Sequence, residues 1–178
     1  MKTLILNGSP RKEGDTASLL SVFKATLLGE VLQIDAFEAN ISPCTDCRAC
    51  SNHSGCCKQD EMQEFYRKLE EYDNIIIASP IWMETLPPPL MSIASRLQPY
   101  FYRPYTGKPK KGGILLVGGG SGGAEKAEST ARLILKQLNV KEIHPLILSN
   151  KTDSVPTKDD QASLRSVCAL AEWMNKNN

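Results

Sequence analysis

The sequence predicts an α/β fold: a doubly wound, five-stranded parallel sheet with helices on both faces. Short apolar segments alternate along the chain with segments whose apolar residues recur at helical spacing. Residues 74–78 and 114–117 show no polar alternation, which is typical of strands covered on both faces. Strands that alternate with helices form a parallel sheet, and the expected strand order is 2-1-3-4-5.

Apolar periodicity locates each expected element. It predicts strands at residues 4–6, 31–37, 74–78, 114–117 and 143–148. It predicts helices at residues 16–27, 62–69, 90–97, 127–138 and 164–174. Asp60 and Gln63 form a capping-box pattern ahead of the second helix. Three consecutive prolines, Pro87 to Pro89, exclude a helix interior, and the aromatic residues from 100 to 105 are expected in a loop.

Length and charge limit the classes of function. At 178 residues the chain is expected to form one domain, 1–178, with a cysteine-rich loop at about residues 39–59. A net charge of +1 and the absence of a long basic run argue against a nucleic-acid partner. No apolar run approaches the length of a membrane span, so no membrane partner is expected. The chain enters a strand without a signal peptide, so we expect a cytoplasmic protein.

The turn after the first strand predicts an anion site. The strand ends in small and polar residues, 7–10, and a helix begins near Thr16. The first N–H groups of a helix lack partners, and the helix dipole adds about half a positive charge there. Ser9, Arg11 and Thr16 are the candidate side-chain donors. Asp15 repels an anion unless its carboxylate turns away to cap the helix.

The spacing of this turn favours a monophosphate. Five residues separate Gly8 from Gly14, and Asp15 stands where a Walker A loop has lysine. The loops after the third and fourth strands are also unusual, with Ser79-Pro80 in one and the glycine run 118–123 in the other. The glycine run fits G-x-G-x-x-G, but we interpret it as a flexible wall beside a flat ring. All three loops are expected at one sheet edge, around a ligand crevice.

Five of the six cysteines lie in the cysteine-rich loop. Cys44, Cys47 and Cys50 are spaced C-x2-C-x2-C, and Cys56 and Cys57 follow. This spacing is compatible with a [4Fe–4S] cluster, with zinc that uses His53 as a further ligand, or with reduced thiols that bind no metal.

Three motifs together resemble one family. They are Gly8-Ser9-Pro10-Arg11 with Asp15-Thr16, the cysteine stretch leading to Asp60-Glu61-Met62, and Ser79-Pro80-Ile81-Trp82. In this order they look like the NAD(P)H-dependent FMN reductase family of flavodoxin-like proteins, including its iron–sulfur flavoprotein branch. The resemblance covers nearly the whole chain. One departure is that Met91 and Ser95-Arg96 stand where the family usually has a lysine and an Asp-Arg pair.

The resemblance implies a flavodoxin-like fold, a noncovalent FMN and NAD(P)H as the reductant. The residues that match the phosphate loop are Ser9, Arg11 and Thr16, with Asp15 among them. Those that match the segment along the isoalloxazine are Pro80, Ile81, Trp82 and Met83. Those that match the glycine loop at the other side of the ring are Gly119, Gly120 and Gly122. Those that match the cluster-binding cysteines of the branch are Cys44, Cys47, Cys50 and Cys56.

Three functions follow as expectations. The first is an FMN-dependent oxidoreductase, reduced by NAD(P)H, that passes electrons to a small acceptor such as a quinone or free flavin. The second is an iron–sulfur flavoprotein that carries electrons through a [4Fe–4S] cluster. The third is a flavodoxin-fold binding module without catalysis. No catalytic acid or base is expected, because the flavin performs the chemistry. The resemblance also implies a homodimer or homotetramer.

Overall fold

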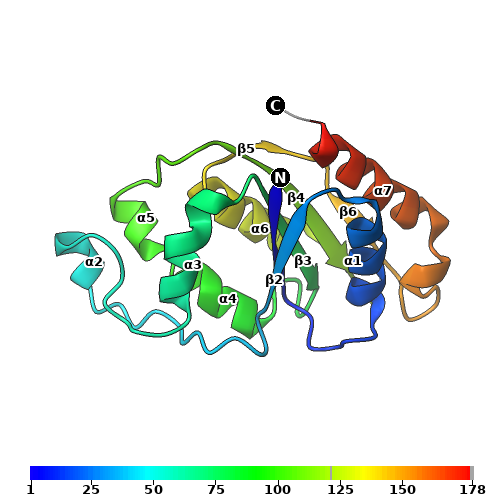
Figure 1. The fold of residues 1–178 in the computed structure, drawn as a ribbon. Helices are drawn as coiled ribbons and strands as arrows, with labels where there is room; N and C mark the ends of the chain where they lie inside the picture. The colour runs from blue at the N-terminus through cyan, green and yellow to red at the C-terminus, as the bar shows by residue number, and fades with distance from the viewer. Residues whose placement is uncertain (121, 177–178) are drawn as a thin grey trace.

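The computed structural model describes residues 1–120 and 122–176, and a parallel sheet forms its centre (Figure 1). The strands are β1 (Lys2–Asn7), β2 (Glu30–Asp35), β3 (Asn74–Pro80), β4 (Lys110–Val117), β5 (Val140–Ile143) and β6 (Ile147–Ser149). Their order is β2-β1-β3-β4-β5, and β6 pairs with β4. The flavodoxin-like α/β fold and the predicted order 2-1-3-4-5 are therefore confirmed.

The single strand predicted at residues 143–148 is wrong in its bounds, because two strands take its place. β5 pairs with the first part of β4, and β6 pairs with Leu115 to Val117. Pro145 lies between the two strands and has no N–H group to donate to the ladder. The sheet consequently has six strands, and the last one still ends at the same edge as β4.

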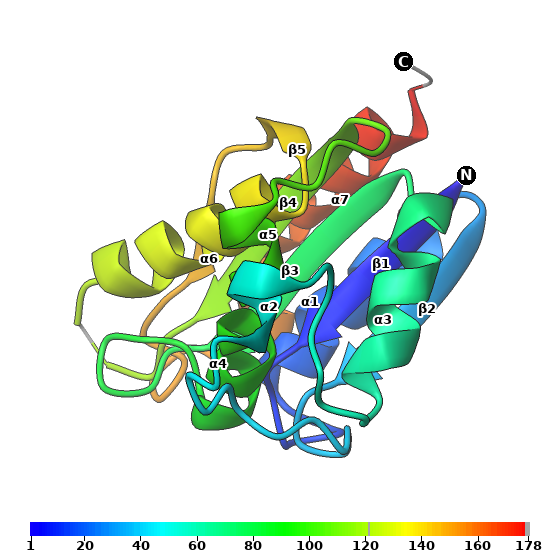
Figure 2. The ribbon, with the colours of Figure 1, turned by 90° about the vertical axis from the view of Figure 1, so that its left-hand side faces the viewer.

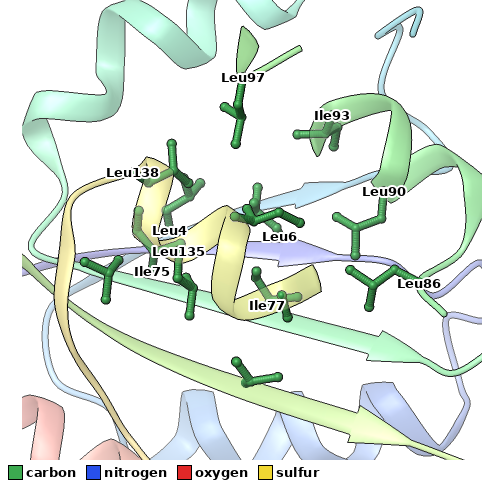
Figure 3. Packing of buried hydrophobic residues seen from close by; sticks show 14 of the residues in the cluster. Leu4, Leu6, Ile75, Ile77, Leu86, Leu90, Ile93, Leu97, Leu135 and Leu138 are labelled. Atoms are coloured by element: carbon green, nitrogen blue, oxygen red, sulfur yellow. The ribbon is translucent and has the colours of Figure 1, made fainter. Parts of the chain in front are cut away.

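Helices cover both faces of the sheet, as expected (Figure 1). The elements with helical structure are α1 (Asp15–Thr26), α2 (Ala49–Asn52), α3 (Met62–Lys68), η1 (Leu69–Glu71), α4 (Pro88–Ser95), α5 (Gln98–Tyr102), α6 (Glu125–Gln137), η2 (Thr157–Asp159) and α7 (Gln161–Asn175). Apolar residues of α1 and α7 share one core cluster, and those of α3, α4 and α6 share the other. Alternate side chains of β1 and β3 enter opposite clusters: Leu4, Leu6, Ile75 and Ile77 pack together (Figure 3), whereas Ile5 and Ile76 face α1.

Three α-helices depart from the expectations: α4, α5 and α2, the last of which lies within the expected cysteine-rich loop. Pro88 and Pro89 begin α4, since proline in a first helical turn removes only N–H groups that have no helical partner. Residues 98–102 form the short helix α5, where a loop was expected.

The capping box before α3 forms only in part: an Asp60 oxygen accepts the Met62 N–H at 3.2 Å, but Gln63 donates to the Cys56 and Lys58 carbonyls instead. No helix among the described residues is both long enough and apolar enough to cross a membrane.

The packing of α6 predicts a stability difference between two leucines of this helix. Leu135 is fully buried, whereas Leu133 is 57% exposed. We expect Leu135→Ala to lower the free energy of unfolding by about 2–5 kcal/mol, because it leaves a cavity against the sheet. We expect Leu133→Ala to change it by less than about 0.5 kcal/mol. Urea unfolding followed by circular dichroism measures both, and equal losses would contradict the packing described for α6.

Candidate functional site

A hollow of about 170 Å³ lies at the edge of the sheet where β1, β3, β4 and β6 end. Its walls include most of the residues predicted for the flavin site: Ser9, Arg11, Asp15, Thr16, Pro80, Ile81, Trp82 and Gly119. Its other lining residues are Pro10, Val117, Thr152 and Asp153. Met83, Gly120 and Gly122 lie outside this lining. The three loops singled out in the sequence therefore meet at one crevice.

Hydrogen bonds hold the β1 loop in shape. The side chain of Asn7 accepts the Ser9 N–H at 3.0 Å and donates to Asp35 at 2.7 Å. The Ser9 hydroxyl oxygen accepts the Arg11 N–H at 3.2 Å, so the hydroxyl proton stays free for a ligand. A Cβ on Gly14 would lie 3.0 Å from the Arg11 Cβ, so this glycine lets the Arg11 stem approach the start of α1. The loop thus presents hydroxyl, guanidinium and helix N–H donors together.

Asp15 is the first residue of α1, and its carboxylate is already engaged. One Asp15 oxygen accepts the N–H of Thr157 at 2.8 Å, which joins α1 to η2. The N-cap is Gly14, and no side chain caps the helix. Asp15 therefore does not cap the helix. The carboxylate instead lines the hollow while one of its oxygens binds the backbone of the last loop.

The β3 loop forms a tight hairpin at the other side of the hollow. Trp82 and Thr85 exchange two backbone hydrogen bonds of 2.9 Å around Met83 and Glu84. Both of these turn residues have positive φ, 49° and 63°, as a type I′ turn requires. The turn places the side chain of Met83 in solvent, 94% exposed, and Glu84 binds Lys126 at 2.5 Å. Trp82 lines the hollow and is 40% exposed, so its indole offers a flat apolar surface to a ligand.

The loop after β6 also lines the hollow, although no motif in the sequence marks it. The N–H groups of Thr152 and Asp153 bond to the carbonyls of Gly118 and Gly119, at 3.0 Å and 3.3 Å. A Cβ on Gly119 would lie 2.8 Å from the Asp153 carboxylate oxygens, so only glycine permits this contact without a shift. The placement of every carboxyl end at one edge of a parallel sheet is the signal that points to this loop.

A larger hollow, of about 440 Å³, lies between α1 and β2 on the outer side of the β1 loop. It shares Ser9, Pro10 and Arg11 with the smaller one and adds Lys24 and Gln33. Only one of the unusual loops reaches it. We therefore place the candidate site in the smaller hollow, where four strand ends and a flat aromatic side chain come together.

A second group of functional side chains lies in the cysteine loop. Cys44, Cys47, Cys50, Cys56 and Cys57 all line one small cavity, together with Arg96. The loop contains α2, which lies beside α5 (Figure 2). Among the described residues, no three Cys, His, Asp or Glu side chains are arranged as a metal site. The loop therefore brings the predicted ligands together without placing them in coordination geometry.

The thiols of this loop differ in their surroundings. The Ala49 N–H and the Cys57 thiol lower the pKa of Cys47. Burial raises the pKa of Cys50, and the nearby Cys56, Cys44 and Cys47 sulfurs raise it further. The hydrogen bond that Cys57 shares with Cys47 raises the pKa of Cys57. Cys50 thus shares one cavity with the other three predicted ligands, and Cys57 pairs with Cys47.

Arg96 fixes both ends of the cysteine loop from α4. Its side chain is fully buried and binds both carboxylate oxygens of Asp60, at 2.5 Å and 3.1 Å. It also donates to the carbonyl oxygens of Ser42 and Lys58. Asp60, 36 residues away in the sequence, is therefore the carboxylate partner of this arginine. Burial raises the pKa of Asp60, but the hydrogen bonds and charge of Arg96 outweigh burial and hold that pKa below its usual value.

A second arginine holds the middle of the loop. Arg103, just after α5, donates to the carbonyl oxygens of Cys50 at 2.6 Å, His53 at 3.1 Å and Ser51 at 3.2 Å. These are carbonyls at the end of α2, which helices leave without internal partners. The backbone around the cysteines is thus positioned by two guanidinium groups.

The buried pair predicts a large loss of stability when Arg96 is removed. We expect Arg96→Met to lower the free energy of unfolding by about 3–5 kcal/mol, because it leaves the Asp60 carboxylate without its partner. Arg48→Met is the matched control, because the Arg48–Asp46 pair is 74% and 77% exposed and surface pairs contribute little. Chemical unfolding at neutral pH measures both variants.

The same pair predicts the pH dependence of this difference. The folded pKa of Asp60 lies below its unfolded value, so its contribution is complete above the unfolded pKa and is lost as pH falls through the folded pKa. The difference between wild type and Arg96→Met should therefore shrink below about pH 4. A difference that stays constant down to pH 2 or so would show that Asp60 is not the partner.

Comparisons with known proteins agree with this architecture. A solved NAD(P)H:quinone oxidoreductase from Methanothermobacter marburgensis superposes with a TM-score of 0.74 at 16% identity, over 100% of this chain and 98% of that one. An "Iron-sulfur flavoprotein" of Archaeoglobus fulgidus is 32% identical over 139 residues, which cover 76% of this chain and 63% of that protein. The match thus spans less than two thirds of the archaeal protein's length. An "Iron-sulfur flavoprotein" of Methanosarcina thermophila is 26% identical over 99% of this chain and 98% of its own.

The family follows from the extent of a further match. The sequence model described as "NADPH-dependent FMN reductase" matches residues 1–153, which include the β1 loop, the cysteine loop, the Trp82 hairpin and the glycine run. This chain therefore belongs to the NADPH-dependent FMN reductase family of oxidoreductases.

Proposed function

We propose that this chain binds FMN in the hollow at the ends of β1, β3, β4 and β6, accepts hydride from NAD(P)H and passes electrons to a small acceptor. The observation that carries the proposal is the convergence of phosphate donors and a flat apolar wall at one crevice. Membership of the FMN reductase family supports the same assignment.

The β1 loop suits the phosphate end of FMN. The N–H groups that begin α1, the free proton of the Ser9 hydroxyl and the exposed Arg11 guanidinium all suit a dianionic group. The opposing charge of Asp15 is moderated by its hydrogen bond to Thr157. The loop length excludes the triphosphate cradle of Walker A proteins, and a monoester phosphate needs no more donors than these.

The Trp82 hairpin and the glycine loop suit the isoalloxazine. Trp82 contributes its exposed indole, and Gly119 removes the side chain that would otherwise meet Asp153. FMN supplies the hydride and single-electron chemistry when it is bound. The side chains of the hollow orient the ring, exclude water from one face and set the local charge. None of them needs to act as a catalytic acid or base.

A second function is favoured by the cysteine loop. We propose that Cys44, Cys47, Cys50 and Cys56 hold a [4Fe–4S] cluster, because all four line one small cavity and thiolates are the usual ligands of such clusters. Arg96 lines the same cavity, and its buried Nε has no hydrogen-bond partner among the described residues. This orphaned donor fits an anionic sulfur ligand. The relatives named iron–sulfur flavoproteins support the same proposal.

Absorption spectroscopy of protein purified without air tests both functions. We expect flavin bands from FMN, together with broad iron–sulfur absorption and matching amounts of iron and sulfide. Flavin bands without iron would support the reductase and contradict the cluster. A colourless protein that takes up no added FMN would contradict both, and would favour a flavodoxin-fold module without catalysis.

The phosphate assignment predicts the effect of one substitution. We expect Arg11→Ala to weaken FMN binding about tenfold or more, because charge-assisted hydrogen bonds contribute about 1.5–3 kcal/mol. Lys12→Ala is the matched control, since Lys12 is 83% exposed, pairs with Glu38 and does not line this hollow. Titration of flavin fluorescence measures both dissociation constants. Equal values for wild type and Arg11→Ala would remove Arg11 from the site.

A further inference from the structure

Cys57 is the one cysteine of the loop that the proposed cluster does not use, and it contacts a cysteine that the cluster does use. The Sγ atoms of Cys47 and Cys57 lie 3.5 Å apart. Both residues are exposed, so small solutes reach them. A disulfide bond measures about 2.05 Å, so the two sulfurs need to approach by only about 1.5 Å.

The other cysteines are directed to different partners. The Cys44 sulfur accepts the Asp46 N–H at 3.4 Å, and the Cys44 N–H binds Ser95. Cys56, although adjacent to Cys57, lies beside the buried guanidinium of Arg96. Cys168 belongs to α7 and contacts Thr26 on the opposite face of the sheet. Among the described residues, Cys47 and Cys57 are the one pair of cysteines whose sulfur atoms form a hydrogen bond with each other.

We propose that Cys47 and Cys57 form a reversible disulfide in the protein that holds no cluster, and that this bond withdraws Cys47 from the ligand set. The second half of this inference rests on the proposed cluster, whereas the disulfide itself does not. Cys57 would then act as a redox partner that competes with iron for one ligand.

Disulfide formation requires a two-electron oxidant, and a hydroperoxide is the oxidant of this proposal. One thiolate attacks the hydroperoxide, the O–O bond breaks, and a sulfenic acid forms as the alcohol or water leaves. The second thiol attacks the sulfenic sulfur, the S–S bond forms and water leaves. Two thiols are oxidised and one hydroperoxide is reduced. An added dithiol restores both thiols by exchange and becomes a cyclic disulfide itself.

Peptide mapping tests the disulfide directly. Trypsin cuts after Arg48 and Lys58, so Cys47 and Cys57 fall in separate peptides, 25–48 and 49–58. We expect cluster-free protein treated with one equivalent of hydrogen peroxide to yield these peptides cross-linked, and a dithiol to separate them. Peptide 25–48 also contains Cys44, and peptide 49–58 also contains Cys50 and Cys56, so fragmentation of the cross-linked pair identifies the two sulfurs.

Matched variants decide the pairing. We expect Cys57→Ser to lose the cross-linked pair, and Cys56→Ser and Cys168→Ser to keep it. Circular dichroism shows that each variant is folded before peroxide is added. A wild-type protein without the cross-link, or a folded Cys57→Ser protein that keeps it at the wild-type level, would overturn the disulfide.

Iron uptake tests the competition. We expect the peroxide-treated wild type to take up little iron and sulfide, and treatment with a dithiol to restore uptake. Equal uptake by the oxidised and reduced proteins would overturn the competition. A reduced protein that takes up no iron would overturn the cluster and the competition that depends on it, while the peptide result would still decide the disulfide.

Discussion

Parallel pairing is the constraint on which this molecule depends. Every strand of the sheet runs in the same direction, so the carboxyl ends of β1, β3, β4 and β6 meet at one edge. The register brings the end of β1 beside Ala78 and the end of β3 beside Val117, and the loops that follow these strands enclose one hollow. The buried strands supply most of the apolar packing. Their loops can therefore contain polar donors, a type I′ hairpin turn and glycines.

Hydrogen bonds from two arginine side chains hold the cysteine loop in position. α2 has no buried residue, so apolar packing contributes little to its position. Arg96 joins Ser42, Lys58 and Asp60, and Arg103 joins the carbonyls at the end of α2. These bonds connect the loop to α4 and α5, which pack beside α3 on the same face of the sheet. The thiols are therefore held at a defined place on the fold without a hydrophobic core of their own.

How far the sequence could predict this arrangement differs from one feature to the next. The run at residues 74–78 identified its strand, because β-branched residues without polar alternation suit a strand buried on both faces. Pro145 divides the predicted last strand in two, and the apolar periodicity of the sequence does not reveal this break. The spacing of the cysteines showed which side chains gather, but not that Asp60 would find Arg96 36 residues away, because such a pairing depends on tertiary packing. Thr152 and Asp153 were not predicted as site residues, because no motif marks them. Only the topology of the sheet brings them to the hollow.

Because α2 is attached mainly by polar contacts, the cysteine loop and the core of the fold are expected to unfold as two separate units. Segments with few buried apolar contacts open with a smaller free energy than the sheet and core helices, and they do so as separate units. α2 and the exposed thiols near it meet that description, whereas Asp60 and Arg96, at the base of the loop, do not. The cysteines can thus exchange backbone amide protons and sulfur partners in a local opening, while the base of the loop and the crevice at the strand ends keep their structure.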